Sequence, residues 1–287
     1  MISMETSSLS PLQARLLEMM KWFHQFCLKH KLRYYCLGGT MLGSQRHHGF
    51  IPWDDDIDIG LPRKDYVRLA ELMKDDAYKP FVLETPYSKN TDYCYPYTKL
   101  YDTRTTLVEN RRKNVVRGVF IDIFPLDGLG ETEQESIQNY KKIDRKYNLL
   151  LSSVCSIRKE RAWYKNLAIL ALKCVPPFLL SYRKLMVELD RLCASIDFDS
   201  SAWVCNCLGA YHFKEIMPRK YFGDPVLYQF EDTQIFGPED YENYLTHLYG
   251  DWRQLPPVEK QKTNHDFVCL DLAKPYLTTG KSSSEKK

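Results

Sequence analysis

The stretch "IPWDDDIDIGL", residues 51–61, places four aspartates within five positions and then alternates isoleucine with aspartate up to a glycine. Alternation with a period of two is typical of a β-strand with one buried face. It predicts that Asp56 and Asp58 lie on one face of a strand and Ile57 and Ile59 on the other. Two adjacent carboxylates raise each other's pKa unless a cation lies between them. The stretch therefore predicts a strand that presents a metal site.

A second apolar strand carries a third acid. In "GVFIDIF", residues 118–124, Asp122 is the one ionisable side chain. A buried carboxylate is costly unless it faces a cation or hydrogen-bond donors. We therefore expect the segments 56–58 and 118–124 to lie together, with Asp56, Asp58 and Asp122 as ligands. Oxygen-only ligands suit Mg²⁺ or Mn²⁺.

The alternative interpretation of an acidic run is a solvated turn or a helix-capping cluster. For Asp54 and Asp55 this alternative is as good as the metal interpretation. For Asp56, Asp58 and Asp122 the apolar neighbours favour the metal.

The segments before the acidic stretch predict a helix and a glycine turn. Ser10–Pro11 marks a helix start, and apolar residues recur at helical spacing over 11–29. Residues 32–40 then indicate a short strand that ends in a turn at Gly38, Gly39 and Thr40. Because glycine lacks a side chain, phosphate can approach the backbone of such a turn closely.

Later segments alternate between strand and helix patterns. We expect a helix over 63–76, strands near 81–85 and 97–101, and a long helix to about 152 that opens with a capping box at Thr132 and Glu135. The chain to about 196 reads as mainly helical, with a break at Pro176–Pro177, and "GPEDYENYLTHLYG" predicts one more helix.

This order of elements is the layout of polymerase-β-like nucleotidyltransferases. The predicted fold is therefore α/β with a mixed sheet: a nucleotidyltransferase-like catalytic core at 10–130, a mostly helical region at 131–275 that completes the acceptor side, and a disordered tail at 276–287.

Composition excludes several classes of protein. A formal net charge of +3 is too small for a general nucleic-acid binder. Nine cysteines without framework spacing predict reduced thiols in a cytoplasmic protein, and Cys205 and Cys207 are interpreted as buried structural thiols. The N-terminal residues lack a signal-peptide pattern, and the apolar stretch at 167–180 is too short to cross a bilayer.

The longest motif identifies a family. The stretch at 34–69, "YYCLGGTMLGSQRHHGFIPWDDDIDIGLPRKDYVRL", resembles the signature of the LicD family, which includes fukutin and fukutin-related protein. "FIDIFPLDG" (120–128) and "YGDWRQLPPVEK" (249–260) extend the resemblance over roughly residues 12–260.

The resemblance implies an activity and a set of site residues. Family members transfer phosphocholine or ribitol phosphate from a CDP-activated alcohol onto a glycan, and CMP leaves. The family's Asp-x-Asp falls on Asp56 and Asp58, its glycine motif on Gly38–Thr40, and its third acidic strand on Asp122. The spacing argument alone does not choose between this reaction and nucleotidyl transfer.

Further residues are candidates for binding the donor's diphosphate. These are Arg46, His47 or His48, Lys99 and Arg104, among which arginine suits two phosphate oxygens at once. Each of them alone is better explained as a surface charge.

Asp122 is the candidate general base, and the alternative is that it only ligates metal while water takes the proton. If the alcohol is choline, Trp53, Tyr97 and Tyr101 could surround the ammonium group, although core packing is the better explanation for each of them.

The expected function is metal-dependent transfer of phosphocholine from CDP-choline to a cell-surface glycan such as lipopolysaccharide, teichoic acid or a capsule precursor. The basic and apolar stretch 158–191 is a candidate for peripheral contact with the inner face of the membrane, where a lipid-linked acceptor would lie; a helical subdomain with a solvated face is the alternative. A true nucleotidyltransferase and a non-catalytic binding protein remain the rival functions.

Overall fold

The computed structural model describes residues 9–74, 78–88, 93–109, 115–154, 181–263 and 267–276, and four positions between 163 and 170. The α-helices are α1 (Pro11–His30), α2 (Gly38–His47), α3 (Arg63–Leu72), α4 (Glu133–Val154), α6 (Tyr182–Cys193) and α7 (Tyr241–Tyr249). The 3₁₀ helices are η2 (His212–Glu215), η3 (Arg219–Tyr221) and η4 (Val258–Lys260).

The strands form one large mixed sheet and two smaller sheets. They are β1 (Tyr35–Cys36), β2 (Asp58–Pro62), β3 (Phe81–Glu84), β4 (Thr98–Asp102), β5 (Thr106–Glu109), β6 (Val115–Arg117), β7 (Phe120–Gly130), β8 (Trp203–Cys205), β9 (Ile216–Pro218), β10 (Val226–Phe230), β11 (Thr233–Gly237) and β12 (Phe267–Asp271).

The large sheet has the order β1-β2-β7-β4-β3, with β8 and β9 joined to β7. The pairing of β2 with β7 is parallel, and the other pairs are antiparallel. The fold is thus α/β with a mixed sheet, as predicted.

Strand β7 is the centre of this sheet. All eleven of its residues are buried. Its first half pairs with β2 and β4, and its second half pairs with β8. The strand therefore links the acidic segments to the chain beyond residue 200.

The N-terminal helix follows the local signals in its sequence. Ser10 accepts a hydrogen bond from the N–H of Gln13, whose side chain accepts one from the N–H of Ser10, so that both ends of the capping box are present. The helix buries its apolar face, which includes Met20 and Phe23, against the sheet and the β10–β11 hairpin.

The predicted helices near 132 and 241 are also present. Glu135 donates its N–H to Thr132 Oγ1, but its carboxylate accepts from Glu131 rather than from Thr132. Helix α7 starts after Asp240, whose side chain accepts from the N–H of Asn243, and ends at Gly250 with φ of 72°.

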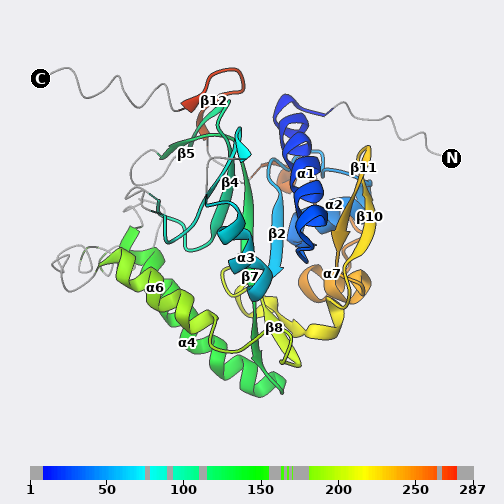
Figure 1. The fold of residues 1–287 in the computed structure, drawn as a ribbon. Coiled ribbons are helices and arrows are strands. Elements are labelled where there is room, and N and C mark those ends of the chain that lie inside the picture. The colour runs from blue at the N-terminus through cyan, green and yellow to red at the C-terminus, as the bar shows by residue number, and fades with distance from the viewer. Residues whose placement is uncertain are drawn as a thin grey trace, which may run out of the picture.

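The helices lie in two groups around the sheet. Figure 1 shows α4 and α6 side by side at one end, and α1, α2 and α7 with the β10–β11 hairpin at the other. The described part of 131–275 holds strands β8–β12 as well as helices, and β12 pairs with β5 of the predicted core. The division near residue 130 stays a prediction, as does the tail at 276–287, of which only Tyr276 is described.

Candidate active site

Two of the predicted carboxylates lie on neighbouring strands at the same level. Asp58 opens β2 and is the register partner of Asp122 on the parallel strand β7. The N–H of Asp122 donates to the carbonyl of Ile57 at 3.0 Å. Partner residues of adjacent strands project on the same face of a sheet, so the two carboxylates are neighbours. The prediction that these two segments lie together is confirmed.

The third predicted carboxylate, Asp56, lies two residues before the first residue of β2. β2 begins at Asp58, so the prediction that Asp56 belongs to the strand is wrong. Asp56 nevertheless lies close enough to raise the pKa of both other acids. Asp56 is therefore close to Asp58 in the chain but does not pair with a neighbouring strand.

Several carboxylates lie close to Asp58. Burial raises the pKa of Asp58 well above its usual value, and the carboxylates of Asp56, Asp122 and Asp54 add to that rise. Within the described ranges, no Lys or Arg forms an ion pair with Asp58. Such a cluster of oxygen ligands fits a divalent cation, which would relieve the repulsion.

The three aspartates are not drawn tightly together in this structure. In the described part of the chain, the group of three donors whose ligand atoms all lie within 4.8 Å is Asp127, Cys193 and Cys207. Asp127 already accepts two hydrogen bonds from Arg63, at 2.6 and 2.7 Å. We therefore interpret that group as a buried ion pair beside structural thiols, which agrees with the buried state of Cys205 and Cys207.

The glycines form the first turn of a helix. Residues 38–40 were expected to be a turn after a strand, and this is wrong: α2 starts at Gly38, whose φ of +48° lets the chain pass from β1 into the helix. The strand itself is shorter than expected, at Tyr35–Cys36.

The start of α2 faces the acidic cluster. Thr40 Oγ1 accepts from the N–H of Asp58 at 2.9 Å. A Cβ at Gly39 would lie 2.7 Å from an oxygen of Asp54, and one at Gly38 would lie 3.7 Å from an oxygen of Asp58. First-turn N–H groups have no partner within a helix and carry partial positive charge, so this end can bind an anion beside the carboxylates.

Lys99 lies beneath Asp122 rather than on the surface. It is the register partner of Asp122 on β4, only 1% exposed, with Nζ 2.8 Å from Asp122 Oδ1. The ammonium group also lies 3.2 Å from the centre of the Phe120 ring. Burial raises the pKa of Asp122, and Lys99 opposes that rise. The structure thus gives Lys99 a carboxylate partner in the core.

The two predicted arginines have protein partners. Arg104 binds the carboxylates of Asp102 and Glu18, and is not brought to the acidic cluster. Arg46, near the end of α2, donates to the carbonyls of Trp252 and Gln254 at 2.9 and 3.2 Å. The late motif at 249–260 therefore holds the helix that carries the glycines.

The two histidines differ in their surroundings. His48 caps the end of α2 with φ of 57°, and its side chain is exposed. His47 is half-buried with its ring edge-on to Trp53, and burial lowers its pKa.

Of the three aromatic candidates, Tyr97 lies at the site. Its hydroxyl is 3.5 Å from Asp122 Oδ2, and its ring packs on Phe124. Tyr101 is fully buried within the sheet core.

Sequence reasoning missed a group of residues from the last third of the chain. Tyr244 accepts from the N–H of Gly38 at 2.9 Å. Tyr249 Oη would lie 3.6 Å from a Cβ at Gly38. Tyr211 donates to Tyr249 Oη at 3.2 Å. Glu215, 6% exposed, accepts from the N–H of Tyr211 at 3.4 Å. The one sequence signal for this group is that Tyr249 opens the late motif.

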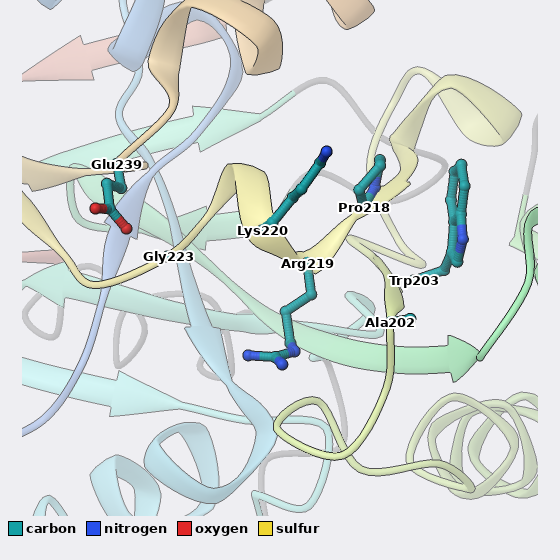
Figure 2. A pocket seen from close by; sticks show the side chains of 7 residues that line it. All are labelled: Ala202, Trp203, Pro218, Arg219, Lys220, Gly223 and Glu239. Carbon is teal, nitrogen blue, oxygen red and sulfur yellow. The ribbon is translucent and has the colours of Figure 1, made fainter.

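A separate surface hollow of about 630 Å³ lies over β8, β9 and η3. Figure 2 shows its lining residues, among which Arg219 and Lys220 point in different directions. None of the predicted site residues lines it.

No helix in the described residues is long and apolar enough to cross a membrane. Most of the basic stretch 158–191 lies outside the described residues, so the predicted membrane contact there stays a prediction.

Comparison with known proteins gives a consistent assignment. The model of the family described as "LicD/FKTN/FKRP, nucleotidyltransferase domain" matches residues 31–150, a range that contains every predicted site residue. The chain is 31% identical over 250 residues to the lipopolysaccharide cholinephosphotransferase LicD of Haemophilus influenzae, a match that covers 87% of this chain and 92% of that protein.

Shorter matches are found in two other bacteria. An uncharacterized protein of Rickettsia typhi is 27% identical over 131 residues, covering 44% of this chain and 38% of that protein. An uncharacterized protein of Rickettsia prowazekii is 40% identical over 58 residues, covering 20% of this chain and 22% of that protein.

Proposed function

Because this chain belongs to the LicD family, we propose that it transfers phosphocholine from CDP-choline to a sugar hydroxyl of a cell-surface glycan, with lipopolysaccharide as the first choice. The name of the Haemophilus influenzae relative supports the phosphocholine group and the glycan acceptor. The observation that carries the proposal is the register pairing of Asp58 with Asp122 beside the start of α2.

The acids would hold Mg²⁺ or Mn²⁺ through Asp56, Asp58 and Asp122. When bound, the metal supplies positive charge that polarises the phosphoryl oxygens of the donor. N–H groups in the first turn of α2, apart from that of Gly38, which donates to Tyr244, would bind the same diphosphate from the protein side, because the start of α2 lies beside the cluster.

The reaction exchanges one P–O bond for another. The acceptor oxygen attacks the phosphorus that bears choline, the bond from that phosphorus to the CMP oxygen breaks, and CMP leaves with the bonding electrons. The hydroxyl proton passes to Asp122 or to water. Asp122 suits the role of base, since burial raises its pKa while Lys99 holds the carboxylate in place.

The family's domain description favours one rival function. It names a nucleotidyltransferase domain, and we propose that the described sheet is such a core. In a true nucleotidyltransferase the attack falls on the nucleotide's own phosphorus and pyrophosphate leaves. The leaving group therefore separates the two functions.

The test incubates the purified protein with Mg²⁺, a cell-envelope extract and one of three donors: CDP-choline, CDP-ribitol or CDP-glycerol. We expect CMP from CDP-choline, loss of CMP with EDTA, and no pyrophosphate. Asp58→Asn should abolish CMP release. Asp55→Asn is the matched control, because Asp55 belongs to the same acidic run but binds Thr263 at 2.6 Å. Absence of CMP from all three donors would refute the proposal.

A further inference from the structure

Glu215 is a buried carboxylate without a cation. Its side chain is 6% exposed and accepts from the N–H of Tyr211, and no Lys, Arg or His of the described residues forms an ion pair with it. A Cβ at Gly209 would lie 2.2 Å from its Oε1, so the carboxylate rests directly on the backbone there. Burying an uncompensated charge is costly, so such a carboxyl is protonated until a cation approaches it, and buried groups of this kind are candidates for ligand binding.

Two tyrosines form the exposed side of this group. Tyr211 is 41% exposed, and its ring lies edge-on to Tyr249 with centroids 5.3 Å apart and planes at 84°. The hydroxyls of the two rings hydrogen-bond at 3.2 Å. Because Tyr211 directly precedes η2 and Glu215 is its last residue, this single turn holds the aromatic ring and the carboxylate together.

The group adjoins the acidic cluster. Tyr249 Oη and Asp58 Oδ2 lie 3.6 and 3.7 Å from the same point, the position of a Cβ on Gly38. Burial raises the pKa of Tyr211, and Glu215, Asp58 and Asp54 contribute to that rise, which agrees with their proximity. A ligand whose phosphate binds at Asp58 can therefore place a short substituent against this group.

We propose that Tyr211, Tyr249 and Glu215 bind the trimethylammonium group of the donor and select choline over uncharged alcohols. The inference rests on the proposed function and names the residues that recognise the donor's alcohol.

The chemistry of the ligand matches the group. A trimethylammonium ion has no hydrogen-bond donor, so it is bound by aromatic rings through cation–π attraction and by a nearby negative charge. Ribitol and glycerol are neutral and need hydrogen-bond partners for each hydroxyl. Burial raises the pKa of the free Glu215 carboxyl to about 8, and an adjacent cation favours its ionised form, so choline gains a counter-charge that a neutral alcohol does not. The two tyrosines add ring surface, and their hydroxyls are already hydrogen-bonded to each other.

The test compares CDP-choline with its neutral isostere, in which a carbon replaces the nitrogen. Dissociation constants are measured by calorimetry with Mg²⁺ and without acceptor, so that no turnover is needed. We expect the wild-type protein to bind CDP-choline about tenfold more tightly than the isostere, the size of one well-placed cation–π contact with added charge attraction. Glu215→Gln and Tyr211→Leu should each remove most of this preference.

Two controls keep the result specific. Tyr211→Phe retains the ring and should keep most of the preference. Tyr87→Leu removes an exposed tyrosine outside the group and should leave the preference unchanged. Because Tyr211 is partly exposed, its variants test the idea even if Glu215→Gln unfolds the protein.

The outcomes separate this inference from the proposed function. An unchanged preference in Glu215→Gln and Tyr211→Leu, or no preference in the wild-type protein, overturns the inference while CMP release can still stand. A preference that disappears in both variants supports the inference, even where CMP assays with every acceptor fail.

Discussion

Replacing Lys99 with methionine tests whether the buried cation beneath Asp122 is a structural element of the site. Methionine keeps the apolar stem and removes the ammonium group. The wild-type ammonium lies 2.8 Å from Asp122 and 4.0 Å from Glu109, and the lysine side chain is 1% exposed. The variant therefore leaves a buried Asp122 carboxylate without its counter-charge.

The expected cost follows from that burial. Removing one partner of a buried ion pair typically destabilises a protein by about 3–5 kcal/mol. The contact of the ammonium with the Phe120 ring is lost as well, which places the expected value in the upper half of that range. The double variant Lys99→Met with Asp122→Asn should recover part of the loss, because the uncompensated charge is then gone.

The assay is urea unfolding followed by circular dichroism, in EDTA so that no divalent ion replaces the lost charge. Lys21→Met is the control, because Lys21 forms an exposed ion pair with Asp232, and such pairs contribute little.

The penalty should also depend on pH. The folded-state pKa of Asp122 is raised by burial, and removal of Lys99 raises it further. A carboxylate with a raised folded-state pKa destabilises the protein above that pKa, and this effect fades as pH falls through it. The stability difference between variant and wild type should therefore shrink on acidification.

A loss below about 1 kcal/mol at neutral pH, equal to a surface substitution, would refute the buried ion pair. A penalty that stays constant from neutral to acidic pH would refute its assignment to the Asp122 charge.

Three further predictions concern the carboxylates and the backbone. Asp58→Asn should lower CMP release by at least about a hundredfold. It should not lower the melting temperature, because it removes one of several buried carboxylates that repel each other. Nucleotide chromatography and thermal unfolding measure the two effects, and normal turnover would contradict the role of Asp58. Gly118→Ala should destabilise the protein by about 1–3 kcal/mol in urea unfolding, because its Cβ would lie 1.9 Å from the carbonyl oxygen of Asp102; an unchanged midpoint would contradict this packing. Burial raises the pKa of Glu215 from a usual 4.5 to about 8. The free energy of unfolding of the wild-type protein should therefore fall relative to that of Glu215→Gln as pH rises from 4.5 to about 8. Parallel stability profiles of the two proteins would contradict this raised pKa.

The sequence was most informative where a pattern is local and repeated. The alternation around Asp58 and the apolar segment around Asp122 predicted two strands that lie together, and β2 and β7 are register partners there. The capping signals at Ser10 likewise predicted the start of α1. These features depend on near neighbours in the chain, so periodicity and capping chemistry are enough to predict them.

Features that depend on distant contacts were harder to predict. The glycines after β1 carry no sign of whether a turn or a helix follows, and the helix is held by contacts from Tyr244 and Trp252. Lys99 looked like a phosphate ligand because a lone basic residue gives no indication of a buried partner, and its partner Asp122 lies on another strand.

The sequence did not predict the group around Glu215, because this group also depends on contacts between distant parts of the chain. Nothing in the neighbouring sequence distinguishes this glutamate from a surface residue, and its burial arises from packing of η2 against α4 and α7. The family resemblance could supply the aspartates, which belong to its motif, but not residues outside it.

The hydrogen bond from Gly38 to Tyr244 has a consequence for synthesis of the protein. The two residues are separated by 206 positions, and the same separation divides Arg46 from Trp252. A nascent chain therefore displays its aspartates long before the ribosome releases the segment that steadies α2. Premature termination anywhere before α7 should yield a polypeptide that retains the whole acidic motif but lacks the contacts that fix the start of α2 beside it.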